Sequence, residues 1–176
     1  MSTVPESLPH EQVTPKFVNN AAAIFCVFRR ADTWLALPAT SVREVLPRPD
    51  MVSLPLTPSA FAGLCHVRSE FIPVVNLESI LPSDSPTVDQ VLLVIPAADG
   101  PWGLLVDQVM NLKHLERSDA PEDEGDGALN AVVGWATEDH KVIQILDASR
   151  IRRVAESQLA GMWPSPEVRA HSLKNQ

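Results

Sequence analysis

An internal repeat limits this chain to a duplicated fold. Residues 62–80 align with residues 133–151 at a constant offset of 71, without a gap. The preceding hairpins match as well, because Trp34-Leu35-Ala36-Leu37 aligns with Trp102-Gly103-Leu104-Leu105 at an offset of 68. Repetition at a fixed period is typical of a structural unit that is built more than once. Chance similarity between two β-segments is the alternative, but a gapless match over a whole hairpin favours duplication.

Short apolar runs define the class of the repeated unit. The links between them are too short for helical crossovers, so neighbouring strands are expected to form antiparallel hairpins. Runs that are apolar on both faces indicate closed or doubly packed sheets. The sequence therefore predicts a mainly β fold of two pseudo-symmetric five-stranded SH3-like β-barrels, with short helices at the subdomain ends. The runs that support this prediction are AIFCVF, TWLAL, FIPVVNL, QVLLVI, WGLLVD and KVIQIL.

Composition excludes several classes of function. Of the 176 residues, 45% are hydrophobic, which is enough for a folded core. A formal net charge of −8 argues against a nucleic-acid-binding protein, which needs a basic surface for phosphates. No apolar stretch approaches the roughly 18 residues that span a bilayer, and no signal peptide is visible. We therefore expect a cytoplasmic protein with no nucleic-acid partner and no direct membrane insertion.

The ends of the chain differ from its middle. Residues 1–20 are polar and contain several prolines, and we expect them to form a flexible arm. Residues 21–154 are expected to form two intertwined barrels, the second over roughly residues 82–146, followed by a C-terminal tail at 155–176. Residues 116–126 hold six acidic side chains against one arginine, a composition that predicts a flexible, solvated loop of the second barrel.

The repeat assigns structural roles to two pairs of residues. Asn76 and Asp147 each follow a strand and precede a short helical stretch, which is the position of a helix N-cap. Capping is what these side chains commonly do there, so we favour it over a catalytic role. Gly63 and Gly134 are expected to relieve backbone crowding where a strand enters its barrel.

Catalytic and metal-binding signals are poor. Cys65 and His66 are adjacent on an expected strand, so their side chains point to opposite faces and cannot form a nucleophile–base pair. Cys26 and Cys65 are too few for a disulfide framework or a four-cysteine zinc site. Asp107 is a lone carboxylate, which performs no general acid–base catalysis unaided. We expect no catalytic residue, no metal and no cofactor. The alternatives are an enzyme that uses Asp107 or Cys65, and a barrel that binds a small ligand between its halves.

Three segments together resemble the CheW family of chemotaxis coupling proteins. FAGLCHVRSEFIPVVNLESIL is similar to the family's signature stretch, and GLLVDQVMNLKHL to its apolar-Val-Asp-x-Val segment. Ser41-Val42-Arg43-Glu44-Val45 stands at its Val-x-Glu-Ile position, and the likeness extends from about Ala22 to Val154. The resemblance implies two SH3-like barrels and a non-enzymatic scaffold. Its partners would be the regulatory domain of a CheA-type histidine kinase and the cytoplasmic tip of a methyl-accepting chemotaxis receptor.

The resemblance also implies a receptor-binding site. Arg68 matches the arginine at the receptor-facing groove, Glu44 matches an acidic position that can pair with it, and Gly63 is assigned to the kinase contact. The alternatives are a solvated turn arginine that pairs with Glu44 or Glu70, and an ordinary barrel core at the apolar positions. The residues that match the apolar lining of the groove are Val42, Phe71, Val91, Val109 and Leu112.

The chain departs from the family pattern at the turn of this hairpin. The family's Asn-Leu-Arg-Gly is His66-Val67-Arg68-Ser69 here, and the usual Asp of the next strand is Asn76. Serine adopts positive φ less readily than glycine, so we expect another geometry for this turn.

Overall fold

The computed structural model describes residues 23–82, 84–85, 88, 90–119 and 131–162. The expected arm at 1–20 lies outside the described residues, as does most of the expected acidic loop. The strands are β1 (Ala23–Arg30), β2 (Thr33–Pro38), β3 (Glu44–Pro47), β4 (Met51–Val52), β5 (Phe61–Val67), β6 (Glu70–Asn76), β7 (Val91–Ile95), β8 (Trp102–Val106), β9 (Gln108–Leu115), β10 (Ser118–Asp119), β11 (Val132–Glu138) and β12 (Lys141–Leu146). The helices are η1 (Ala39–Ser41), η2 (Leu77–Ser79) and α1 (Ala148–Met162).

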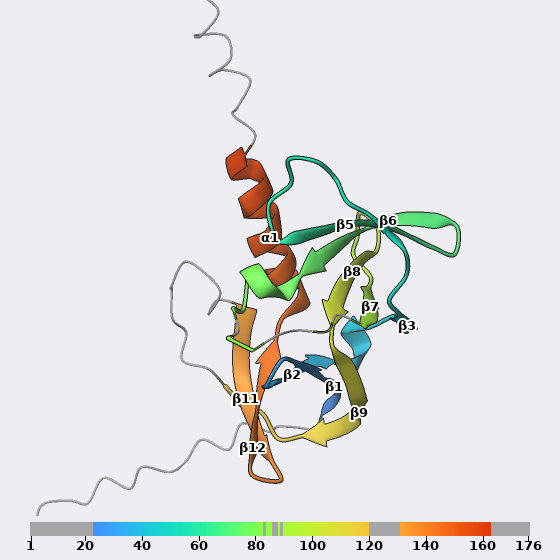
Figure 1. Ribbon diagram of the computed structural model, residues 1–176. Helices are drawn as coiled ribbons and strands as arrows, with labels where there is room; N and C mark the ends of the chain where they lie inside the picture. Colours follow the sequence, from blue (N-terminus) through green and yellow to red (C-terminus); the bar gives the residue numbers. More distant parts are fainter. Residues whose placement is uncertain (1–22, 83, 86–87, 89, 120–130, 163–176) are drawn as a thin grey trace, which may run out of the picture.

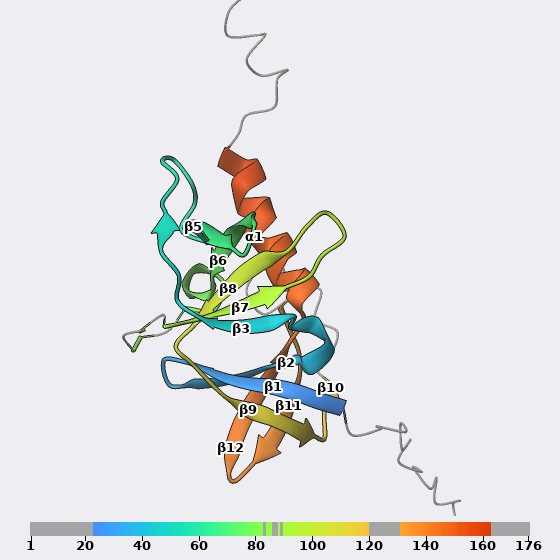
Figure 2. The same cartoon turned by 90° about the vertical axis from the view of Figure 1, so that its right-hand side faces the viewer.

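The strands form two six-stranded sheets, which stack as two barrels (Figures 1 and 2). The lower barrel has the order β10-β11-β12-β2-β1-β9, and the upper barrel has the order β4-β5-β6-β8-β7-β3. The two orders correspond strand for strand, so the prediction of a duplicated, mainly β fold is confirmed. Each sheet has six strands rather than the expected five because β4 and β10, of two residues each, add a short edge strand to each sheet.

The two sequence repeats exchange their leading hairpins. The β1–β2 hairpin of the first repeat joins β9–β12 of the second, and β7–β8 of the second joins β3–β6 of the first. Each exchanged hairpin is held on both sides: β2 pairs with β12 and β6 with β8 in parallel, and β1 pairs with β9 and β3 with β7 in antiparallel orientation. The expected antiparallel hairpins are confirmed for strands adjacent in the chain, whereas the parallel pairs were not predicted, because strands adjacent in the chain reveal nothing of pairs made at long range. For the same reason, the strands of one barrel do not coincide with residues 82–146.

Three apolar cores hold the molecule together. Phe25, Ala36 and Ile143 belong to the interior of the lower barrel, and a second set fills the upper one. The largest core lies between the barrels and continues under α1, which contributes Ile151 and Ala155. Burial of this surface is the main favourable term that fixes the two barrels together. Buried residues of this central core include Phe28, Leu35, Leu37, Leu93, Ile95, Trp102, Leu104 and Val106.

Gly63 and Gly134 occupy equivalent β-bulges, as the repeat predicts. The register of β5–β6 shifts between Phe61 and Gly63, and that of β11–β12 shifts between Val132 and Gly134. A Cβ atom on Gly63 would lie 2.4 Å from the Val52 carbonyl oxygen, and one on Gly134 would lie 2.6 Å from that of Ser118. Gly63 therefore lets β4 approach its bulge, and Gly134 lets β10 approach the other. The expected relief of backbone crowding is confirmed.

The expected caps are also present. Asn76 Oδ1 accepts a hydrogen bond from Glu78 N at 2.9 Å, and Asp147 Oδ1 accepts one from Arg150 N at 2.9 Å. The helix that Asp147 starts continues to Met162, so residues 155–162 are helical where the sequence led us to expect a tail. Its apolar positions Ile151 and Ala155, one turn apart, explain the extension, because they pack on the central core. None of the described helices is long and apolar enough to cross a membrane.

We predict that Gly63→Ala destabilises the protein by about 2–4 kcal/mol, because it combines an unfavourable positive φ of 140° with a backbone clash. The matched control is Gly100→Ala: its φ is 127°, but no atom lies within 4 Å of the added Cβ. Urea denaturation at equilibrium measures both free energies of unfolding. An equal loss in the two variants would contradict a role for the close approach of β4.

Candidate functional site

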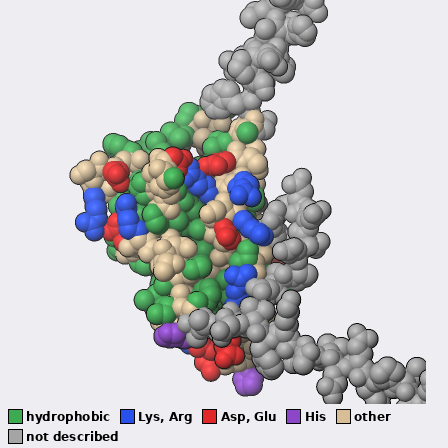
Figure 3. Space-filling view, turned by 180° about the vertical axis from the view of Figure 1, so that it is seen from behind, with side chains coloured by type: hydrophobic (Ala, Val, Ile, Leu, Met, Phe, Trp, Pro, Cys, Tyr) green, Lys and Arg blue, Asp and Glu red, His purple; other side chains and the backbone are tan. Residues whose placement is uncertain are grey.

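A cluster of charged side chains lies at the tip of the β5–β6 hairpin. Arg68 Nη2 donates to Glu44 Oε2 at 3.0 Å, which ties the hairpin to the start of β3. Arg43 lies between two acids, 3.4 Å from Glu44 and 3.8 Å from Glu70. Seen from behind, basic and acidic side chains gather at this edge of the upper barrel (Figure 3). The pairing of Arg68 with Glu44 is therefore present, and we name Arg43, Glu44, Arg68, Glu70 and Phe71 the tip cluster.

The turn that presents Arg68 has an unusual backbone. Arg68 itself has a φ of +56°, whereas Ser69 is not among the residues with positive φ. In the equivalent turn of β11–β12, Asp139 and His140 both have positive φ. The two hairpin turns of the repeat thus differ in geometry. A non-glycine residue in this region is strained, and the Arg68 side chain at this strained position pairs with Glu44.

The ion pair changes the electrostatics of Glu44. The hydrogen bond from Arg68 has the largest effect and lowers the pKa of the Glu44 carboxyl; desolvation opposes it, and the charges of Arg68 and Arg43 lower the pKa further. Glu44 is consequently ionised throughout the neutral range. Because Arg68 is mostly exposed, the pair adds little to stability. Its role is to hold a charged group in a defined place.

Phe71 adds an exposed aromatic ring to the tip cluster. Phe71 is 73% exposed, and the centroid of its ring lies 5.0 Å from that of the His66 ring. Residues opposite each other on paired strands point to the same face, so both rings lie outside the upper barrel. The tip cluster therefore combines an exposed apolar ring with fixed charges.

The remaining residues implied by the family resemblance lie at a second place, between the barrels. Val42, Val91 and Val109 are half-buried and pack against the central core, the first two from the upper barrel and the third from β9. Leu112 is exposed on the same face of the lower sheet, since it pairs with Cys26 while Val109 pairs with Phe28. We name Val42, Val91, Val109 and Leu112 the inter-barrel surface. Its first three members pack against the central core, as the alternative of ordinary barrel core predicts for these positions.

Sequence reasoning missed an apolar surface next to Gly63. Val52 of β4 pairs with Leu64 of β5, on the face opposite the core of the upper barrel. The chain then continues through Leu54 and Leu56, both exposed, and Leu56 is 85% exposed at a φ of +61°. We name Val52, Leu54, Leu56 and Leu64 the β4 surface. The signal was present in Leu54-Pro55-Leu56-Thr57-Pro58, where leucines alternate with polar and proline residues outside any strand-length run.

Gly63 itself is buried under β4. The close approach of Val52 leaves no room for a side chain there, so any contact of this region with a partner is made by the β4 surface around the glycine.

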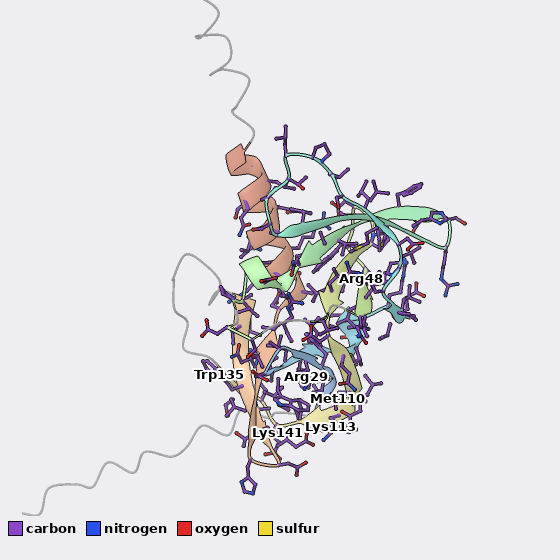
Figure 4. All side chains as sticks on the ribbon, viewed as in Figure 1. Arg29, Arg48, Met110, Lys113, Trp135 and Lys141 are labelled. Atoms are coloured by element: carbon purple, nitrogen blue, oxygen red, sulfur yellow. The ribbon has the colours of Figure 1, made fainter. Side chains whose placement is uncertain are left out.

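Three charged side chains of the lower barrel, Lys113, Glu138 and Lys141, contact other residues of the same barrel. Lys113 and Glu138 form an ion pair at 2.5 Å, and the Lys141 ammonium lies 4.2 Å from the centroid of the Trp34 ring. Figure 4 shows Lys113 on β9 and Lys141 at the far end of the β11–β12 hairpin. These contacts link β9 with β11 and β12 with β2, all within the lower barrel.

The side chains considered as catalytic candidates, Asp107, Cys26 and Cys65, have structural surroundings in this fold. Asp107 lies in a cleft of about 600 Å³ at the junction of the barrels, but both of its carboxylate oxygens accept hydrogen bonds from the chain. Burial raises the pKa of the Cys26 and Cys65 thiols, which keeps them protonated and poorly nucleophilic. Within the described ranges, no group of three or more His, Cys, Asp or Glu side chains could hold a metal ion.

The fold and these exposed surfaces define a two-barrel protein-interaction module. Comparison with known proteins gives its family: the model of the CheW-like domain matches residues 25–156, and the chain belongs to this family of chemotaxis scaffold proteins. Over 137 residues it is 28% identical to Protein FrzA of Myxococcus xanthus, a match that covers 74% of this chain and 85% of FrzA. The scaffolding protein TtCheW of Thermoanaerobacter tengcongensis has the same fold, with a TM-score of 0.62 and 23% identity over 72% of this chain and 89% of that one.

We predict that the Glu44 carboxyl titrates below the ordinary glutamate pKa, and that Arg68→Ala moves its midpoint up towards 4.5. Because the folded-state pKa is lowered, the pairing is complete above the ordinary pKa and is lost as pH falls through the lowered value. Side-chain carboxyl NMR measures the midpoint. Arg43→Ala is the control and should shift it less, because Arg43 contributes less to the lowering. An unchanged midpoint in Arg68→Ala would show that the pair does not form in solution.

Proposed function

We propose that this chain is a cytoplasmic, non-enzymatic adaptor that couples methyl-accepting chemotaxis receptors to a CheA-type histidine kinase. Its family membership supports a scaffold in chemotaxis signalling. The observation that carries the proposal is the presence of two separate surfaces. One is the tip cluster with the adjoining inter-barrel surface, to which both barrels contribute, and the other is the β4 surface of the upper barrel. A coupling protein needs distinct surfaces, because it must hold two partners at once.

The receptor contact is assigned to the tip cluster and the inter-barrel surface. An amphipathic helix binds through apolar anchors spaced along one face, with polar groups that fix its register. Phe71 and Leu112 offer exposed apolar anchors, and Val42, Val91 and Val109 provide a half-buried floor between the barrels. Arg68, held by Glu44, supplies the fixed charge.

The kinase contact is assigned to the β4 surface. Val52, Leu54 and Leu56 are exposed leucine and valine side chains on one continuous segment beside the Gly63 bulge. Apolar side chains grouped in this way are the usual core of a protein–protein interface. The regulatory domain of a CheA-type kinase, itself CheW-like according to the resemblance, would present a barrel surface of matching chemistry.

We predict that Arg68→Glu weakens binding to a purified receptor tip about tenfold or more, because it places a like charge beside Glu44 and removes the donor that fixes register. Isothermal titration calorimetry measures the affinity. Arg153→Glu, the same charge change at an exposed position of α1, is the control and should bind as the unaltered chain does. Receptor affinity that is unchanged in Arg68→Glu, with an unchanged melting temperature, would remove the tip cluster from the site.

We predict that Leu56→Asn weakens kinase binding about fivefold to tenfold while the protein stays folded. Asparagine tolerates the positive φ found at this position, so the backbone is kept and only the exposed apolar group is lost. Binding to the kinase regulatory domain is measured by calorimetry. The control is Val142→Asn, which removes an exposed apolar side chain from the lower barrel. Equal losses in both variants would argue against the β4 surface as the kinase contact.

A further inference from the structure

Asp107 occupies the single residue between β8 of the upper barrel and β9 of the lower barrel. It is only 8% exposed. Its Oδ2 accepts a hydrogen bond from Ala31 N at 2.6 Å, its Oδ1 accepts one from Val88 N at 3.1 Å, and its own N–H donates to Arg29 O at 3.1 Å. One side chain therefore fixes the crossover to the β1–β2 turn of the lower barrel and to the segment that leads into β7 of the upper one.

Arg30 extends this connection across the barrel interface. It ends β1 of the lower barrel, is 2% exposed, and donates from Nη1 to Asp107 Oδ1 at 3.4 Å. Its Nη2 donates to Asn76 Oδ1 at 3.0 Å and lies 3.6 Å from Glu78 Oε2, both in the upper barrel. Asn76 thus accepts from Arg30 with the same oxygen that caps η2. The guanidinium joins the crossover of the chain to the end of β6.

Stability alone does not explain a buried ion pair at this place. Removing two charges from water is costly, and apolar side chains of similar size often stabilise a protein at least as well. Buried polar groups are better attested as devices that select one arrangement of packed elements. The central core is apolar and its contacts have little directionality, so directional hydrogen bonds are what can select one orientation of the barrels.

The connection lies next to the inter-barrel surface. Val109 follows Asp107 by two residues on β9, and Val91 follows Val88 by three at the start of β7. These two valines come from different barrels, and both pack against the central core. A change in barrel orientation at Asp107 therefore alters the spacing of the side chains that would contact a receptor helix.

We propose that Asp107 and Arg30 are positioning residues that set the orientation of the two barrels and thereby the geometry of the inter-barrel surface; the consequence for receptor binding rests on the proposed function. Asp107→Asn replaces an acceptor oxygen by an amide nitrogen, so one of the hydrogen bonds that hold the crossover is lost. The kinase contact on the β4 surface lies wholly within the upper barrel, so its affinity is expected to stay constant.

The test measures barrel orientation and binding separately. Spin labels are attached to Asp50→Cys in the upper barrel and Val142→Cys in the lower barrel, both exposed positions, while the native Cys26 and Cys65 are buried and stay unlabelled. Pulsed electron paramagnetic resonance gives the distance distribution between the labels. Calorimetry on unlabelled full-length protein gives the affinities for a purified receptor tip and for the kinase regulatory domain. Glu138→Gln, which removes an ion pair within the lower barrel, is the matched control.

We expect Asp107→Asn to widen or shift the distance distribution and to weaken receptor binding about tenfold, with kinase affinity unchanged and no effect of Glu138→Gln. Arg30→Lys, which keeps the charge but cannot serve Asp107 and Asn76 together, should show the same changes to a smaller extent, and it replaces Asp107→Asn if that variant does not fold. An unchanged distance distribution overturns the proposal, as does a changed distribution with unaltered receptor affinity. If the unaltered chain binds no receptor tip, the proposed function fails, while the distances still decide whether Asp107 sets the orientation.

Discussion

Burial of the central apolar core between the two barrels is the interaction on which the rest of the structure depends. Phe28 of β1, Leu104 of β8 and Ile151 of α1 come from three distant parts of the chain and pack into one cluster. Each repeat alone would leave these side chains in water, because its leading hairpin belongs to the other barrel. Burying them together makes the exchange of hairpins favourable. The shape of every exposed surface between the barrels follows from this packing.

The two repeats agree at their bulges and helix caps and differ at their hairpin tips. Gly63 and Gly134 make the same bulge, and Asn76 and Asp147 make the same cap. At the hairpin tips the copies diverge: Arg68 alone has positive φ in one turn, whereas Asp139 and His140 share it in the other. A common packing requirement fixes the buried positions in both copies, while a solvent-facing side chain is not constrained by it. The proposed contacts with partners lie among these divergent positions.

Prediction of the candidate site succeeded for contacts between residues close to strand ends. Glu44 and Arg68 pair as the family resemblance implies, because each stands beside a turn and has a long side chain. The apolar residues were harder to predict, since Val42 and Leu112 look alike in the sequence but Val42 packs on the central core and Leu112 is exposed.

Leu54 and Leu56 were missed because apolar residues in an irregular segment have no periodicity that shows which face they occupy. Asp107 was noticed as a lone carboxylate, but its partners Ala31 and Val88 are backbone donors, which a sequence does not display.

The sequence by itself determined what depends on neighbouring residues: the strands, the bulge glycines, the caps after β6 and β12, and the duplication of the unit. These features arise from backbone preferences and alternation of apolar side chains over a few residues. Only the tertiary structure decided which hairpin completes which barrel, how far Asn76-capped η2 lies from Arg30, and which apolar side chains face solvent. The physical reason is that these outcomes depend on pairings such as β2 with β12, whose residues are more than 100 positions apart and meet only when the whole chain is packed.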